Sequence, residues 1–347
     1  MSRVETRGWT AGDEPEVERF VAGHPEGLVY YLPAFRRYLL AVAGGECRSR
    51  LAFEDGRLTG VLPVLVLKGA HGDILNSQPF FGSNGGVLAT TAAAETALRG
   101  EYERMAAACA AATWVSHPFT DVTAPAHDIT DERIAQWTDL GGGEAGLMAV
   151  IEPSARRNIQ KARAEGVVVR EAADALPFLE ATHRENMAAI GGRAKPAAFF
   201  SALGETMTFG RDWRLYVAER LGEPLAALLT FEAARTVEYV MPVVKEPARP
   251  LQPTAAVLAH AMGDAAARGF TRWNWGGTWL TQEGVYRFKK KWGARERRYQ
   301  YFVTVNDRSL LSRGAAELSA AYPWYFTVPF GALAPAALSG VEGQEQT

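Results

Sequence analysis

The chain has 347 residues, with 37 Lys plus Arg against 39 Asp plus Glu and a formal net charge of −2. At about 150 residues per domain, this length predicts two domains. Hydrophobic residues make up 48% and charged residues 22% of the sequence, which excludes a disordered chain. The nearly balanced charge excludes a surface that binds nucleic acid over its whole extent.

No apolar run reaches the roughly 18 residues that a membrane span needs, and the first residues lack the apolar core of a signal peptide. We therefore expect a cytoplasmic protein without stable membrane insertion. The two cysteines, Cys47 and Cys109, are too few for a disulfide framework or a cysteine-rich zinc site. The six histidines show no ligand spacing, so no metal site is expected.

A weak internal repeat organises the chain, with one copy starting at Ser49 and the other at Trp213. Each copy has the pattern strand, tight turn, strand, strand, alanine-rich helix, strand. The helices are expected over residues 91–112 and 254–268. A hairpin, a third strand and a helix that crosses to a fourth strand predict α/β units with mixed strand pairing.

A helical insertion separates the two copies. Ser154 is expected to cap a helix that Pro153 opens, and Gly166 is expected to end it in the left-handed conformation. A strand over 167–171 and a second helix over 176–190 follow.

The densest glycine run, residues 141–143, predicts the boundary between the halves. The expected domains are residues 1–148 and residues 149–306, followed by a C-terminal segment, 307–347. This segment is expected to pack back on the first domain and to have a disordered end. A membrane-surface or dimer contact is the alternative for its apolar part.

The insertion helix carries a basic cluster whose position favours an anionic ligand. Arg156 and Arg157 lie in its first turn, where the helix dipole disfavours cations by roughly 0.3–1 kcal/mol. Arg157 and Lys161 are four residues apart and share a face. Phosphate recognition explains these charges, and a solvated or salt-bridged face is the alternative.

A second basic cluster follows the second copy of the repeat. Val285, Phe288 and Trp292 are spaced as the apolar stripe of a helix, which Gly293 would end. The spacing leaves the basic residues for the other faces, where lysines near a helix C-terminus are stabilised by the dipole. These basic residues are Arg287, Lys289, Lys290 and Lys291. A stabilised helix end and a ligand site therefore both fit the spacing.

Glycines accompany the third strand of the first copy, in Phe80 to Gly86, and the fourth strand of the second copy, in Asn274 to Trp279. They either form turns or let the backbone approach a ligand.

The chain resembles the Fem-type aminoacyltransferases, which build peptidoglycan bridges and are pairs of GNAT-like (N-acetyltransferase) domains. The resemblance covers roughly residues 25–305 and rests on three stretches. These are Arg156-Arg157-Asn-Ile-x-Lys161-Ala-x-x-x-Gly166-Val, Phe81-Gly-Ser-x-Gly-Gly86 and Gly284-Val-Tyr-Arg-Phe-Lys-Lys-Lys-Trp-Gly293. The last stretch is the most specific of the three.

The resemblance implies two tandem GNAT-like domains, each a mixed β-sheet flanked by helices. No heptad run is present, so we expect no coiled-coil arm. The implied activity is transfer of an aminoacyl group from aminoacyl-tRNA to an amine or hydroxylamine. The acceptor would be a peptidoglycan precursor or a natural-product intermediate. No cofactor is implied, because aminoacyl-tRNA is a co-substrate.

The resemblance also implies the site residues. Lys289 matches the functional lysine of the family, and Phe288 lies with it beside donor and acceptor. Arg156, Arg157 and Lys161 would hold phosphates of the tRNA acceptor end or of a nucleotide-linked acceptor. Further candidates for substrate binding are Lys290, Tyr286, Asn274, Gly276 and Gly277.

An acyl-CoA-dependent N-acyltransferase is the alternative activity, with a CoA thioester as donor. The wider superfamily binds the pyrophosphate of CoA at a glycine-rich turn that opens the helix after the third strand. Here that stretch is Arg249-Pro-Leu-Gln-Pro-Thr, in which both glycines are replaced and prolines remove N–H donors. The sequence therefore favours aminoacyl-tRNA over CoA.

An aminoacyl ester is already activated, so the absence of a recognisable Ser/His/Asp or Cys/His arrangement is compatible with this chemistry. Lys289 would place a positive charge beside the developing oxyanion. No general base is identified, because Glu238, Glu283 and Asp121 are candidates by location only and the substrate itself could serve.

Overall fold

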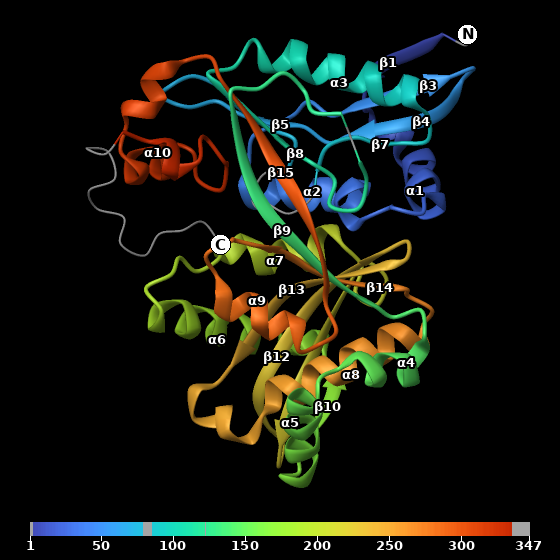
Figure 1. Ribbon diagram of the computed structural model, residues 1–347, viewed down its shortest axis with the longest axis vertical. Helices are drawn as coiled ribbons and strands as arrows, with labels where there is room; N and C mark the ends of the chain where they lie inside the picture. The colour runs from blue at the N-terminus through green and yellow to red at the C-terminus, as the bar shows by residue number, and fades with distance from the viewer. Residues whose placement is uncertain (1–2, 79–84, 122, 335–347) are drawn as a thin grey trace. The chain divides into compact units, whose positions relative to one another are not determined.

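The computed structural model describes residues 3–78, 85–121 and 123–334 (Figure 1). It forms two compact units, which are residues 1–134 with 297–347 and residues 135–296. The division thus differs from the one expected after residue 148, which falls inside helix α4 (Gly143–Val150). Two long strands, β9 (Ile129–Asp139) and β15 (Arg295–Val305), contribute residues to both units, so the chain changes units within strands.

The first unit contains two groups of paired strands. One has the order β1-β3-β4-β7, and in the other β15, β8, β6, β5 and β2 are successive neighbours. Strands β6 and β8 are parallel, as the crossover through helix α3 requires, whereas β15 and β8 are antiparallel. The strands are β1 (Val4–Gly8), β2 (Glu46–Cys47), β3 (Arg50–Glu54), β4 (Arg57–Leu62), β5 (Leu65–Leu67), β6 (Ile74–Asn76), β7 (Leu88–Ala89) and β8 (Ala111–Val115).

The α-helices of the first unit are α1 (Glu14–Gly23), α2 (Pro33–Ala43), α3 (Ala92–Ala106) and α10 (Ala315–Ala321). Helix α3 lies on β1, β3 and β4 and buries Leu98 and Tyr102 against Trp114 of β8. This is the alanine-rich helix predicted for the first copy of the repeat, but it ends at Ala106 and not at residue 112, because strand β8 begins at Ala111.

The C-terminal segment belongs to the first unit. The Tyr322 hydroxyl donates to the Gly72 carbonyl over 2.7 Å, and the Tyr325 hydroxyl donates to the Gly44 carbonyl over 2.9 Å. The end expected to be disordered, residues 335–347, lies outside the described residues.

The second unit contains strands in the order β10-β11-β12-β13-β14. Hairpin β11–β12, strand β13, helix α8 and strand β14 follow one another as the second copy of the repeat predicts. The hairpin turn is Leu221-Gly222, and both residues have positive φ angles. The strands are β10 (Val168–Glu171), β11 (Trp213–Arg220), β12 (Glu223–Ala233), β13 (Thr236–Val244) and β14 (Arg272–Thr278).

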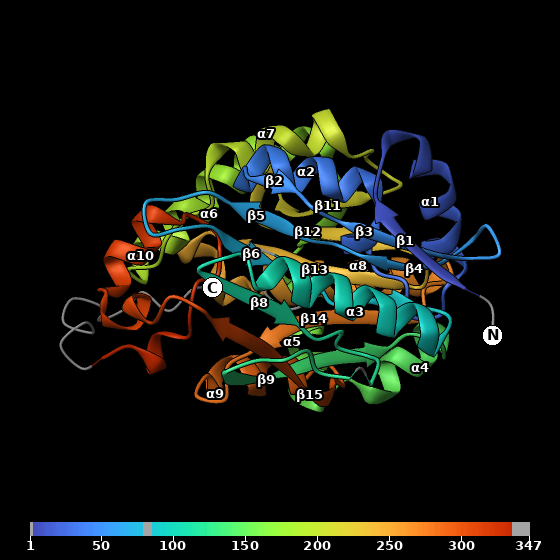
Figure 2. The same ribbon diagram turned by 90° about the horizontal axis from the view of Figure 1, so that it is seen from above.

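The other helices of the second unit are α5 (Pro153–Ala164), α6 (Leu176–Ala189), α7 (Ala197–Thr206), α8 (Pro253–Ala267) and α9 (Glu283–Lys290). Helix α8 packs on β10 to β13 and on α5 and α4, and α6 packs on β12 and β13. Figure 1 shows α8, α5 and α4 as one group, away from α6 and α7. Figure 2 gives the same elements from above.

Helix α5 starts one residue earlier than its predicted cap. Glu152 is the N-cap and Pro153 occupies the first helical position, where a missing N–H and a fixed φ are favourable. Ser154 therefore lies inside the first turn, and its buried Oγ has no hydrogen-bond partner among the described residues. Gly166 ends the helix with φ 77°, as predicted.

None of the helices in the described ranges combines the length and the apolar character of a membrane span.

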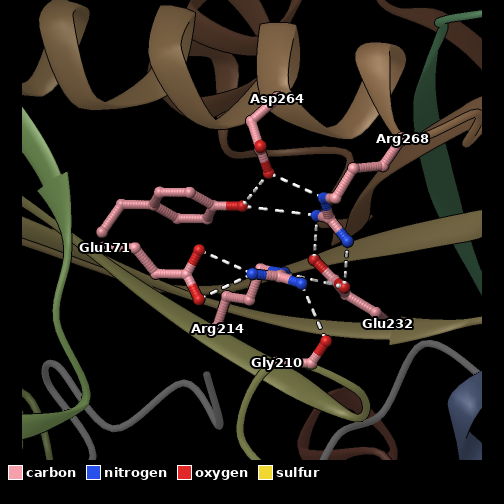
Figure 3. Close-up of polar contacts among 7 residues, drawn as sticks. Glu171, Gly210, Arg214, Glu232, Asp264 and Arg268 are labelled. Atoms are coloured by element: carbon pink, nitrogen blue, oxygen red, sulfur yellow. Dashed lines mark hydrogen bonds and ion pairs between the residues drawn. The ribbon is translucent and has the colours of Figure 1, made fainter.

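A network of charged side chains joins α8 to the sheet (Figure 3). Glu232 of β12 is buried and accepts hydrogen bonds from Arg268 at 2.5 and 2.6 Å and from Arg214 at 3.3 Å. Arg214 also pairs with Glu171 of β10, and Asp264 of α8 accepts from Arg268. The two arginines compensate the buried carboxylate and fix the C-terminal end of α8 over β10 to β12.

We expect Glu232→Gln to lower the free energy of unfolding by about 3–5 kcal/mol, because the two arginines lose the buried charge that compensates them. Urea unfolding followed by circular dichroism measures this loss. Glu223→Gln, at the exposed start of the same strand, is the matched control and should change stability by less than about 0.5 kcal/mol. Equal effects of the two substitutions would contradict the structural role of the network.

Candidate functional site

The candidate site lies where β13 and β14 stop pairing. The two parallel strands pair from Thr236 with Arg272 to Glu238 with Asn274, and both continue for several residues beyond the last pair. On its other side β13 has an extra residue opposite β12, because Leu229 faces Met241 whereas Thr230 faces Tyr239. Such a bulge bends a strand and ends regular pairing. Backbone groups of β14 beyond Asn274 therefore need partners other than β13.

Side chains supply some of these partners. The Asn274 amide is buried, its Oδ1 accepts from the Gly276 amide at 3.0 Å, and its Nδ2 donates to Glu238 Oε2 at 2.7 Å. Gly276 has φ 72° within strand β14, a backbone conformation that favours glycine. The Gly277 carbonyl accepts a hydrogen bond from Lys289.

Lys289 is buried, with only 4% of its surface exposed. Its Nζ donates to Thr278 Oγ1 over 2.7 Å and to the Gly277 carbonyl over 3.1 Å. Burial lowers the pKa of Lys289 to about 7, since the charged form loses solvation. Within the described residues, no ion pair involves Lys289.

Two expectations about this helix are wrong. The spacing predicts Lys289 on a face turned away from the core and Val285 in the apolar stripe, but Lys289 is buried and Val285 is 43% exposed. The helix ends at Lys290, and Trp292 is buried beyond it. Phe288 and Lys289 are the residues that face inward. Lys289 can be buried because Gly277 and Thr278 accept hydrogen bonds from its ammonium group.

Two residues that sequence reasoning missed complete the surroundings of Lys289. The Thr278 hydroxyl donates to Gln136 Oε1 over 2.9 Å, and Gln136 Nε2 donates to the Tyr286 carbonyl over 3.4 Å. Gln136 is fully buried on β9. Thr278 could have been found because it directly follows the two glycines of the fourth strand. Gln136 gives no local signal, since strand pairing brings it from 142 residues away.

The other candidates from the last motif surround this group. The Phe288 ring meets Trp275 edge-on with centroids 6.2 Å apart. The Tyr286 hydroxyl hydrogen-bonds Glu296, and the Lys290 ammonium lies 3.6 Å from the same carboxylate. Lys290 and Tyr286 thus form an ion-paired cluster of their own.

The basic residues of α5 divide into two kinds. Arg156 donates to the Met148 carbonyl at 3.0 Å and so links α5 to α4. Arg157 and Lys161 are exposed, and neither forms an ion pair within the described part of the chain. The Glu152 amide donates to the Lys291 carbonyl over 2.8 Å, so α5 begins where α9 ends.

The remaining predicted residues have other surroundings. Of the three carboxylates considered as bases, Glu283 pairs with Arg287 and Asp121 pairs with Arg297. Glu238 is held by Asn274 as described above. In the first repeat copy, residues 81–84 of the glycine-rich stretch lie outside the described residues, and the Gly85 carbonyl accepts from Tyr31.

The N-terminus of α8 offers few donors to a phosphate. Pro253 occupies the first helical position and has no N–H, and Gln252 before it has φ 58°. The amides of Ala255 and Ala256 both donate to the Gln252 carbonyl, at 3.0 and 3.3 Å. A helix N-terminus binds anions through its free first-turn amides; here Pro253 has no N–H and the Ala255 amide is used internally.

No group of three or more His, Cys, Asp or Glu side chains that could hold a metal ion occurs in the described ranges.

Residues 153–290 match the family model of the acetyltransferase (GNAT) domain. The second unit carries a GNAT domain. A match to this domain model indicates an acyltransferase, and the matched residues contain the whole group of Lys289, Thr278, Gly277 and Asn274. A sequence search of curated proteins found no match.

The GNAT domain lies in a chain whose fold is shared with FemX, at a TM-score of 0.69 and 15% identity over 88% of this chain and 98% of that one. A second similar structure is the C-terminal DUF2156 domain of a protein described as a putative lysylphosphatidylglycerol synthetase from Agrobacterium fabrum. Its TM-score is 0.59 at 12% identity, over 92% of this chain and 99% of that one. L-PGS from Bacillus licheniformis has a TM-score of 0.51 at 12% identity, over 80% and 93%. The fold is therefore Fem-like, as expected.

We expect the stability that Lys289 contributes to depend on pH. Its pKa is about 7 in the folded chain and about 10.4 in an unfolded one. Between these values the unfolded chain binds more protons, so the free energy of unfolding rises with pH, by up to about 1.4 kcal/mol per pH unit. Below pH 7 both states hold the proton and the contribution is constant.

Urea unfolding of the wild type and of Lys289→Met at several pH values between about 7 and 10 measures this slope. The difference between the two proteins isolates Lys289, because Lys195, whose pKa burial lowers to about 8, is present in both. A difference that does not change with pH would contradict a depressed lysine pKa.

Proposed function

We propose that the chain transfers an aminoacyl group from aminoacyl-tRNA to an amine or hydroxylamine. The acceptor would be part of a peptidoglycan precursor or of a natural-product intermediate, and the reaction would take place in the cytoplasm. The observation that carries the proposal is the buried Lys289 of α9, which donates to Gly277 and Thr278 at the end of β14. Lys289 belongs to residues 284–293, the stretch that most resembles Fem-type enzymes. The FemX-like fold is compatible with it, and the lysylphosphatidylglycerol synthetase among the similar structures favours an aminoacyl group.

The chemistry needs little from the protein. The ester of aminoacyl-tRNA is activated, so the acceptor nitrogen can attack the carbonyl carbon directly. A hydrogen-bond donor beside the developing oxyanion typically contributes about 100–1,000-fold in rate, and the Nζ of Lys289 would supply it. Holding both substrates together would supply much of the remaining acceleration.

The second role falls to α5. Arg157 and Lys161 share an exposed face and form no ion pair with any of the described residues. They would bind phosphates of the tRNA acceptor end or of a nucleotide-linked acceptor, whereas Arg156 would act on the position of α5 through Met148.

The donor is proposed to be tRNA and not CoA because of α8. A CoA pyrophosphate would have to bind a helix that begins with Pro253 and whose Ala255 amide donates to the Gln252 carbonyl. Fewer free amides leave a weaker anion site at this helix end.

Incubation of the full chain with a mixed pool of charged tRNAs and candidate amines tests the proposal. We expect loss of the aminoacyl ester and formation of an amide, and the product names the amino acid. Lys289→Met should reduce the rate at least about 100-fold, whereas Lys291→Met, an exposed neighbour, should retain it.

Calorimetric titration with acetyl-CoA is the companion measurement, and we expect no binding. Tight binding of acetyl-CoA together with stable charged tRNAs would overturn the proposal in favour of an acyl-CoA-dependent enzyme.

We further expect Arg157→Ala with Lys161→Ala to raise the KM of the phosphate-bearing substrate and to make it less sensitive to salt. Removing a cation that neutralises one phosphate lowers the slope of log affinity against log salt by close to one unit. Arg163→Ala, on a different face of the same helix, is the control. An unchanged slope in the double variant would mean that this face of α5 is merely solvated.

A further inference from the structure

The Lys289 Nζ has three positions besides its bond to carbon, and two hydrogen bonds occupy two of them, which fixes the direction of the third. An uncharged amine has two N–H groups and one lone pair, and a charged ammonium has three N–H groups. Two acceptors are present, Thr278 Oγ1 at 2.7 Å and the Gly277 carbonyl at 3.1 Å. In the neutral form both N–H groups are therefore used, and the lone pair occupies the direction that the third N–H takes in the charged form.

The hydroxyl of Thr278 has a defined orientation as well. It donates its proton to Gln136 Oε1 over 2.9 Å, so it can only accept from Lys289. Gln136 is in turn fixed by its donation to the Tyr286 carbonyl. This chain of hydrogen bonds makes the lysine a donor to Thr278 in either protonation state.

Among the described residues, the strands that face Lys289 carry no charge near it. Residues 273–278 of β14 and 135–138 of β9 are uncharged. On its own helix, Glu283 pairs with Arg287, and Lys290 pairs with Glu296. An uncharged, buried environment favours the neutral amine over the ammonium.

We propose that Lys289 is the general base of the acyl transfer, with Thr278 and Gln136 as residues that position it. This inference rests on the proposed function and supplies the base that the three carboxylates do not provide. In this role Lys289 enters the step as a neutral amine and becomes the positively charged donor beside the oxyanion only after it has taken the proton, so its positive charge is not permanent.

Lys289 takes up one proton during the step and gives it back, so the protons balance. The acceptor nitrogen, which enters as a free amine, forms a C–N bond to the ester carbonyl carbon and becomes positively charged as the carbonyl oxygen becomes an oxyanion. The neutral amine of Lys289 takes one proton from this nitrogen. The oxyanion then re-forms the carbonyl, the C–O bond to the ribose breaks, and Lys289 returns the proton to the ribose oxygen. Lys289 ends as it began.

Substitution by arginine separates the two roles, because arginine keeps a positive charge and does not give up its proton near neutral pH. We expect Lys289→Arg and Lys289→Met each to lower the transfer rate at least about 100-fold. Lys291→Met is the control for loss of a lysine from the same segment. Lys289→Arg activity well above that of Lys289→Met, with both variants folded, would overturn the inference in favour of a fixed charge.

The pH profile adds a readout that a purely structural role would not move. Hydroxylamine serves as acceptor because it is largely unprotonated at neutral pH. We expect kcat to rise with an inflection near pH 7, where Lys289 loses its proton. Thr278→Val should displace this inflection and lower kcat, and Thr278→Ser should restore both. A flat profile in the wild type would overturn the inference.

A measurement without any substrate tests Lys289 directly. The wild-type chain is acetylated with acetic anhydride at a series of pH values, and mass spectrometry gives the extent of labelling of each lysine. We expect the labelling midpoint of Lys289 near pH 7 in the folded chain and at about pH 10.4 in the urea-unfolded chain. Equal midpoints would overturn the inference even where transfer is observed. Loss of transfer from every charged tRNA, with separate midpoints, would instead overturn the proposed function.

Discussion

A lysine buried among uncharged groups is the constraint on which the candidate site depends. Withdrawing an ammonium from water is unfavourable unless acceptors replace the lost solvent. The sheet provides them because β14 separates from β13 after Asn274, which leaves the Gly277 carbonyl and the Thr278 hydroxyl for Lys289. Helix α9 is also held from its C-terminal side, where the Trp292 carbonyl accepts from Thr138 of β9. Strand divergence, helix orientation and the depressed pKa are therefore parts of one arrangement.

Helix α8 has contrasting ends. Its N-terminus begins with Pro253, which has no N–H, and the Ala255 amide is used internally. Its C-terminal half is fixed by Arg268 and Asp264, which belong to the network around buried Glu232. The charged groups on this helix thus stabilise the domain, whereas α5 presents cations that form no ion pair with the described residues. Charge in the sequence does not by itself distinguish these two uses.

The order of elements could be read from the sequence because alternation and alanine-rich periodicity are local. The second copy of the repeat appears as predicted, including a tight turn, which lies at Leu221-Gly222. The domain limits could not be predicted, because β9 and β15 carry the chain between units without any change in composition. The last motif identified Lys289 but not its burial, which follows from partners on another element. The role of Gln136 and the ion pair of Lys290 with Glu296 could not be predicted either, because in both cases the partner lies on another element.

The passage of β9 and β15 between units also orders the events of synthesis. Residues 135–296 are contiguous, so the GNAT domain has all its strands once residue 296 has left the ribosome. The other unit must wait for β15, whose residues 301–305 pair with β8, and for Tyr322 and Tyr325. Because domains generally fold as units during translation, the domain encoded in the middle of the chain can complete its folding before the one that starts it.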